Sequence, residues 1–128
     1  MAESILRIKS KQFAIDIIHA CREMRKNKVE YALIDQLLRS GTSVGANIHE
    51  AQFAQGTKDF ISKLEIALKE CNECDYWLDI LMSTQSITTL KSSMLSAECD
   101  EIRKILIFSV NTLKRKQKTG TENRHKIM

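Results

Sequence analysis

The sequence predicts an all-α protein of four long helices, and three observations indicate this. The chain has 128 residues with no proline and only four glycines, so few residues interrupt a helix. Hydrophobic residues make up 43% of it and aromatic residues only 5%, which suits an aliphatic helical core. Apolar residues also recur at steps of three and four along four separate stretches. We expect an antiparallel up-down-up-down four-helix bundle over residues 1–117, followed by a flexible basic tail over residues 118–128.

The first predicted helix covers about residues 4–26. Two neighbouring apolar rows give it one broad hydrophobic face. The cluster of Lys and Arg at its end suits the negative end of the helix dipole, and Asn27 is the expected stop. The two rows are Phe13, Ile17, Ala20 and Met24 beside Ala14, Ile18 and Cys21.

The second predicted helix starts near residues 29–31, ends around Ala54, and contains a segment of unusually small residues: Gly41, Ser43 and Gly45. Glycine inside a helix costs about 1 kcal/mol relative to alanine, so such a segment is expected where another backbone comes close. We therefore predict a tight helix–helix crossing, with the Asn47 amide bonding across it. The alternative is a break in the helix at Gly41–Gly45.

Glu50 lies one turn beyond Asn47 and is expected to be partly buried near the same crossing. A buried carboxylate without a cation is costly, so we expect Glu50 to pair with Arg39 or Lys69. Gly56 is expected to turn the chain in a left-handed conformation after the second helix, and Thr57 to cap the third.

The third predicted helix runs from about Thr57 to residues 82–84 on a seven-residue apolar repeat. Tyr76 and Trp77 are adjacent and point about 100° apart. We expect one of them in the protomer core and the other at an interface between subunits. The repeat consists of Phe60, Leu64, Ala67, Cys71, Cys74, Leu78 and Leu81.

The fourth predicted helix begins at a Thr88 or Thr89 cap. Its apolar face is expected to be strong only from Ile102 onward, and its pattern dissolves after Lys114. The residues expected to mark it are Leu90, Met94, Ala97, Glu98, Glu101, Ile102, Ile105, Leu106, Phe108, Ser109 and Leu113.

Three motifs carry a family resemblance: RSGTSVGANIHEAQ, then DFISKLEIALKE with YWLDIL, then AECDEIRKILIFSVNTLKRK. Over about residues 5–117 the chain resembles the four-helix-bundle family first noted in intervening sequences of large-subunit ribosomal RNA genes. The resemblance implies antiparallel protomers that assemble into rings, often homopentamers. A distantly similar protein is the accessory protein of diversity-generating retroelements, which binds a reverse transcriptase and nucleic acid. Most members have no established activity.

The net charge of +4 is concentrated at the two ends of the chain. Residues 1–28 hold seven Lys and Arg against three acids, and residues 114–128 hold six against one. In an up-down bundle these ends meet, which predicts one basic patch able to contact RNA or DNA phosphates. The alternative is that these side chains only solvate the protein and complement helix dipoles. The predicted patch consists of Arg7, Lys9, Lys11, Lys114, Arg115, Lys116 and Lys118.

Four cysteines lie at apolar or small positions of the helical patterns. Cys71 and Cys74 are one turn apart and would face the same way, as metal ligands do, with Cys21, Cys99 or His19 as further ligands. The alternative, which we predict, is that they fill the core as reduced thiols without metal or cofactor.

No catalytic constellation is visible in the sequence. His49 precedes Glu50 without the HExxH spacing of a zinc protease, and Ser43 has no recognisable base. No apolar run approaches the ~20 residues that span a bilayer, and no signal peptide is recognisable. We predict a cytoplasmic, non-enzymatic oligomeric scaffold or accessory protein that binds RNA or DNA through its basic ends. The alternative is a protein–protein adaptor without nucleic-acid contact.

Overall fold

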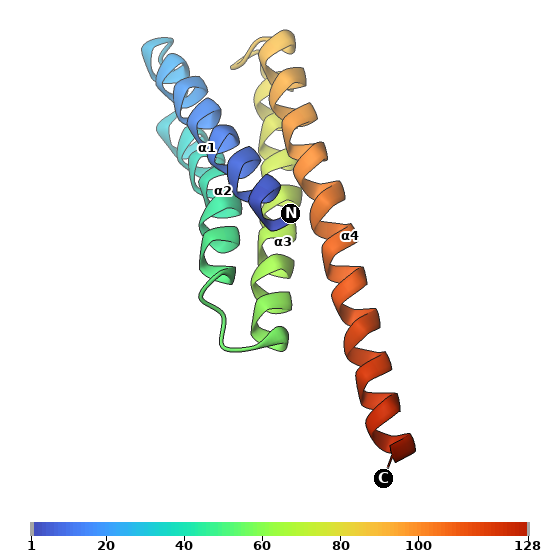
Figure 1. Ribbon diagram of the computed structural model, residues 1–128. Coiled ribbons are helices and arrows are strands. Elements are labelled where there is room, and N and C mark those ends of the chain that lie inside the picture. The colour runs from blue at the N-terminus through green and yellow to red at the C-terminus, as the bar shows by residue number, and fades with distance from the viewer. Residues whose placement is uncertain (1, 128) are drawn as a thin grey trace.

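The computed structural model describes the backbone of residues 2–127 and the side chains of residues 5–120. Within that range it contains four α-helices and no strand: α1 (Ala2–Lys26), α2 (Tyr31–Ala51), α3 (Thr57–Ser83) and α4 (Thr89–Ile127). Each helix packs against the next one in the chain, and α1 also packs against α4 (Figure 1). The prediction of an all-α four-helix fold is confirmed.

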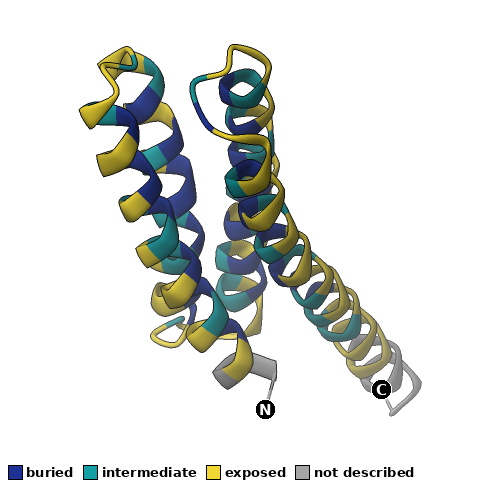
Figure 2. Ribbon diagram, turned by 90° about the horizontal axis from the view of Figure 1, so that it is seen from above, coloured by how far each residue is buried: buried dark blue, intermediate teal, exposed yellow. Residues whose placement is uncertain are grey.

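A single hydrophobic core lies between the four helices, whose buried faces point toward one another (Figure 2). On α3 the predicted repeat is buried from Leu64 to Leu81, and Ile61 takes the first core position in place of Phe60, which is half-buried. On α1 the first predicted row is buried in full, at Phe13, Ile17, Ala20 and Met24, and in the second row Cys21 is buried while Ala14 and Ile18 are half-buried. Regular apolar spacing therefore predicted the core of these two helices correctly.

The segment of small residues makes the close crossing that the sequence predicts, and its partner helix is α1. A methyl group added at Gly41 would lie 2.9 Å from Ile17 Cγ1, and one added at Gly45 would lie 3.3 Å from the Ser10 carbonyl oxygen. The α2 helix is continuous through both glycines, so the alternative of a helix break is wrong.

The chain leaves α1 and enters α4 through local caps. Lys28, and not Asn27, takes the left-handed conformation after α1, with φ 61°. The Val29 amide donates to the Met24 carbonyl at 3.0 Å, which satisfies an acceptor left open at the helix end. At the other end, the Thr88 hydroxyl accepts from the Lys91 amide at 3.1 Å, as predicted for a cap.

The connection between α2 and α3 differs from the prediction. The α2 helix already ends at Ala51, and Gly56 is the residue just before α3, with φ 135°. Thr57 is the first residue of α3 and makes no capping bond. The Asp59 carboxylate accepts from the Gln55 amide at 3.1 Å instead, and its charge suits the positive end of the helix dipole.

The buried face of α4 matches the prediction only in part: Ile102 and Leu106 are buried, as expected, and Ile105 and Leu113 pack against the core. Leu90, Met94 and Phe108 are 73%, 53% and 67% exposed. This helix carries apolar residues on two sides, so its period alone did not identify the side that meets α1 and α3. Over residues 89–120, the part of α4 whose side chains the structure describes, the buried residues are Ser92, Leu95, Cys99, Ile102, Leu106 and Val110.

The backbone of α4 stays helical beyond Gln117, where a tail was predicted, and continues to Ile127. At 39 residues it is much longer than α1, with 25, and its last part extends away from the other helices (Figure 1). Every described side chain from residue 114 to residue 120 is exposed. The flexibility of residues 118–128 stays a prediction, and the side chains of 121–128 lie outside the described residues.

Candidate nucleic-acid interface

The seven basic residues expected in one patch lie in two groups. Lys9 Nζ lies 2.6 Å from the Glu101 carboxylate of α4, whereas Lys114 Nζ lies 2.8 Å from the Glu65 carboxylate of α3. Glu101 and Lys114 are thirteen positions apart on α4, about 20 Å along a helix axis. Lys9 and Lys114 are thus held by acids of different helices, and the single basic patch stays a prediction.

In the first group, which is on α1, Arg7 and Lys11 line a groove between α1 and α2, on the outer side of their crossing. The groove is open and has a volume of about 660 Å³. Its floor is formed by residues with at most one methyl group, Ala14, Gly45 and Ala46. The small residues that let the two helices touch therefore also leave this surface hollow. The other lining residues are Arg7, Ile8, Ser10, Lys11, Thr42 and His49.

Arg7 and Lys11 are both exposed and lie one helical turn apart at this groove. Among the described residues neither makes an ion pair with a carboxylate. Glu50, the acid nearest to His49 in the sequence, pairs with Lys63 at 3.1 Å. Both cations are thus free to meet an external anion.

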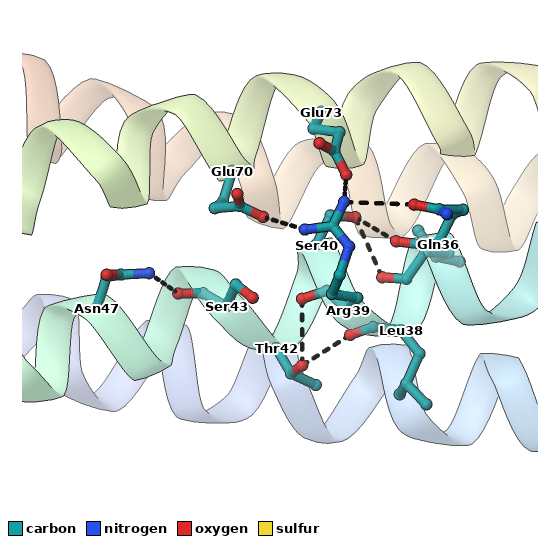
Figure 3. Close-up of polar contacts among 10 residues, drawn as sticks. Gln36, Leu38, Arg39, Ser40, Thr42, Ser43, Asn47, Glu70 and Glu73 are labelled. Carbon is teal, nitrogen blue, oxygen red and sulfur yellow. Dashed lines mark hydrogen bonds and ion pairs between the residues drawn. The ribbon is translucent and has the colours of Figure 1, made fainter.

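The seam between α2 and α3 shows the opposite arrangement (Figure 3). Arg39 donates to Glu70 at 3.1 Å and to Gln36 at 3.4 Å, and it also forms an ion pair with Glu73. Between α3 and α4, Arg103 is held by Asp75 and Asn72. These guanidinium groups join neighbouring helices, and their charges are neutralised by acids of the same chain.

Two predicted contacts near the crossing are wrong. The Asn47 amide does not bond across the crossing, because it donates to the Ser43 carbonyl one turn earlier in α2 at 2.8 Å (Figure 3). Two positions after Gly45, Asn47 lies about 200° around the helix and so points away from α1. Glu50 is exposed, and its cation is Lys63 and neither of the two expected ones.

The second basic group lies on the extended part of α4. Arg115, Lys116 and Lys118 are exposed, and no ion pair neutralises them within the described residues. Lys114 belongs to this stretch but is paired with Glu65. The group therefore presents three uncompensated cations on a helix that extends past the bundle.

All four cysteines are reduced and buried. Burial raises the pKa of the Cys21 thiol to about 11. A hydrogen bond with the Cys99 thiol, together with burial, raises the pKa of Cys71 well above its usual range. Thiols that stay protonated are poor metal ligands and poor nucleophiles. Across residues 5–120, no three His, Cys, Asp or Glu residues come together as a metal site.

The adjacent aromatic residues point in different directions, as predicted. Trp77 packs against the hydrophobic core, whereas Tyr76 is 57% exposed. Their rings contact each other edge to face, with centroids 5.0 Å apart. The expected contact of one of them with a second subunit stays a prediction.

Sequence reasoning missed the exposed Phe53 ring beside the groove residue His49. The Phe53 side chain is 73% exposed and lies beside the His49 ring, with centroids 5.5 Å apart. The spacing of four between these two residues matches that between Arg7 and Lys11. The ring was missed because α2 was expected to continue to about Ala54. The helix ends at Ala51, which leaves Phe53 in the turn, outside the core.

Comparisons with known proteins place the chain in a family. A family model described as 23S rRNA-intervening sequence protein matches residues 3–108. The fold is similar to a solved structure from Bacteroides thetaiotaomicron, described as a protein with unknown function from the S23 ribosomal protein family. The two share 41% sequence identity with a TM-score of 0.84, over 87% of this chain and 99% of that one.

No protein with curated annotation matches the chain. Among the described residues, no helix combines the length and the apolar character that crossing a bilayer requires. With a family model covering most of its length, the chain belongs to the family of 23S rRNA-intervening sequence proteins.

Proposed function

Because the chain belongs to this family, we propose that it is a non-enzymatic, oligomeric accessory protein of the cytoplasm that binds RNA or DNA. The observation that carries this proposal is the contrast between its cations. Those at the helix seams, Arg39 and Arg103, are neutralised by carboxylates of the same chain. The exposed cations of the groove and of the α4 extension have no such partner. Unpaired cations gain most from a polyanion, because phosphate contacts release condensed counterions.

The up-down-up-down arrangement is part of the proposal and is supported by the order of ion pairs. Rising residue numbers on one helix meet falling numbers on the next, as expected for helices that run in opposite directions. The pairs are Glu50–Lys63 and Arg39–Glu70 between α2 and α3, and Lys114–Glu65 and Arg103–Asp75 between α3 and α4.

Self-association into a ring, with a pentamer favoured by the family resemblance, is the second part. Leu90, Met94 and Phe108 are exposed and fall on one side of α4, at intervals of whole turns. Exposed apolar side chains that line up in this way are typical of surfaces covered by a partner. Light scattering should give a mass several times the 14.7 kDa of one chain, and the mass of a single chain would contradict this part.

The nucleic-acid proposal is tested by charge reversal. The variant Arg7→Glu with Lys11→Glu should bind a fluorescent RNA or duplex DNA at least tenfold more weakly, since each lost phosphate contact costs affinity at low salt. A matched control reverses two exposed cations of α3, Lys58→Glu with Lys69→Glu, and changes the net charge equally. Equal losses in both variants would show a response to net charge alone. Absence of any complex with the unaltered protein at low salt would overturn the proposal.

A further inference from the structure

We infer that the groove between α1 and α2 seats a single strand of nucleic acid, with phosphates on Arg7 and Lys11 and an unstacked base on Phe53. This inference rests on the proposed function and specifies the form of nucleic acid. It is carried by three features: the hollow shape of the groove, its unpaired cations, and the exposed Phe53 ring, which contacts the groove residue His49.

The shape comes from the close crossing of the helices. At Gly45 the α2 backbone approaches the Ser10 carbonyl so closely that an added Cβ would lie 3.3 Å from it. Ala14 and Ala46 on either side fill little of the space above that contact. The result is a volume of about 660 Å³, within the ~300–1,000 Å³ that binding sites for small organic groups usually occupy. A sugar and base fit in such a space, whereas the backbone of a duplex would pass over it.

The charge of the groove favours an anionic occupant. Arg7 and Lys11 stand one turn apart on its α1 side, and no carboxylate is among its lining residues. An arginine can hold a phosphate with two parallel hydrogen bonds, and a lysine acts on the next phosphate as a point charge. The Thr42 hydroxyl on the α2 side donates to the Leu38 carbonyl at 2.7 Å, which leaves its oxygen free to accept a bond from the ligand.

The aromatic ring distinguishes a single strand from a duplex. Phe53 is 73% exposed, so its ring is open to a ligand, and the His49 ring lies against it. Bases of a single strand can leave their stack and lie on such a ring, while bases of a duplex are held inside the helix. An acidic amphipathic helix would also meet the two cations and could place an apolar side chain on the ring, so the experiment includes an acidic peptide.

The experiment measures the affinity of the full chain for a short unstructured single strand, as RNA and as DNA, and for the duplex of the same sequence. Phe53→Ala should weaken binding of both single strands at least about fivefold, the loss typical of one stacked base. The matched control is Tyr31→Ala, which removes a 67% exposed ring at the other end of α2 and should change no affinity by more than about twofold.

A second variant fills the groove without changing charge or the core. Ala46→Leu places a larger side chain on the exposed floor and should weaken single-strand binding by a comparable factor. Its control is Ala32→Leu, at an exposed position of the same helix outside the groove. Thermal unfolding curves of all four variants establish that each is folded.

The outcomes separate this inference from the proposed function. The inference is supported if Phe53→Ala and Ala46→Leu lower the affinity for single strands, while their controls Tyr31→Ala and Ala32→Leu do not and the affinity for the duplex is unchanged. Unchanged affinities in both variants, with loss only on reversing Arg7 and Lys11, would overturn the groove as the seat of a single strand and leave nucleic-acid binding intact. Equal losses for duplex and single strand would also overturn it. Complex formation with an acidic peptide but with no nucleic acid would overturn both proposals.

Discussion

The two sides of α2 use the same kinds of residue in opposite ways. Toward α3, Arg39 is held by Glu70 and Glu73, so its charge is used within the protein. Toward the outer side of α1, Arg7 and Lys11 border a hollow and meet no carboxylate. Composition and net charge do not distinguish these cations. The difference lies in what the neighbouring helix places opposite each one, and it separates structural charges from those available to a partner.

The largest expected effect is a loss of folding stability when the close crossing of α1 and α2 is filled. Gly41→Ala should destabilise the protein by roughly 1–3 kcal/mol, because the new methyl would lie 2.9 Å from the buried Ile17 side chain. Urea unfolding measures the loss. Gly120→Ala is the control, because nothing lies within 4 Å of the added methyl there and alanine favours a helix. A Gly41→Ala protein as stable as the unaltered one would show that α1 and α2 are not tightly packed.

The next prediction compares one cation from each side of α2, Arg39 and Arg7. Arg39→Ala should lower the free energy of unfolding by up to about 1 kcal/mol, the range of exposed ion pairs, and leave nucleic-acid affinity unchanged. Arg7→Ala should do the reverse, weakening binding at constant stability. The pair is checked by denaturant unfolding and by fluorescence anisotropy. If Arg39→Ala weakened binding as much as Arg7→Ala, the distinction between the two sides would fail.

The smallest effect is a pH dependence at the seam between α1 and α4. Burial, together with hydrogen bonding to Asp16, raises the pKa of Glu98 to about 7. The charged groups around it are Asp16 and Lys9 from α1, and Glu101 and Lys91 from α4. A carboxyl that binds its proton more tightly in the folded state loses stability as pH rises from its unfolded value toward 7.

Glu98→Gln should therefore raise the melting temperature at pH 8 and change it much less at pH 5, where the carboxyl is mostly protonated in the fold. The shift should be small because this side chain is only half-buried and water screens the charges. Glu101→Gln is the informative counterpart, since the Lys9 ammonium holds the pKa of Glu101 below its usual range. An equal gain at both pH values for Glu98→Gln would show that its proton plays no part.

The sequence predicted the fold where one physical pattern dominated. On α3 small or apolar residues recur without interruption every three or four positions from Leu64 to Leu81, and this regular row predicted the buried side correctly. On α4 the helical spacing fits the exposed Leu90 and Met94 as well as the buried Leu95, so it did not show which face is buried. Tertiary packing against α1 and α3 decided which face is buried.

The candidate site was less predictable because it depends on register between helices. The basic residues were found, but Lys9 and Lys114 turned out to be paired with acids from other helices. The groove exists because α1 crosses α2 at Gly45. The small residues predicted a close crossing there, but they did not show which helix makes it. Phe53 was missed because the end of α2 is set by the turn before Gly56.

The most direct test of the central claim is the salt dependence of nucleic-acid binding for Arg7→Ala with Lys11→Ala, compared with the unaltered protein. Each phosphate contact contributes about 0.7 to the slope of log affinity against log salt for a single strand and about 0.9 for a duplex. If both cations hold phosphates, the slope should become shallower by about 1.4–1.8. An unchanged slope would contradict the account, because the two free cations of the groove would then contact no nucleic acid.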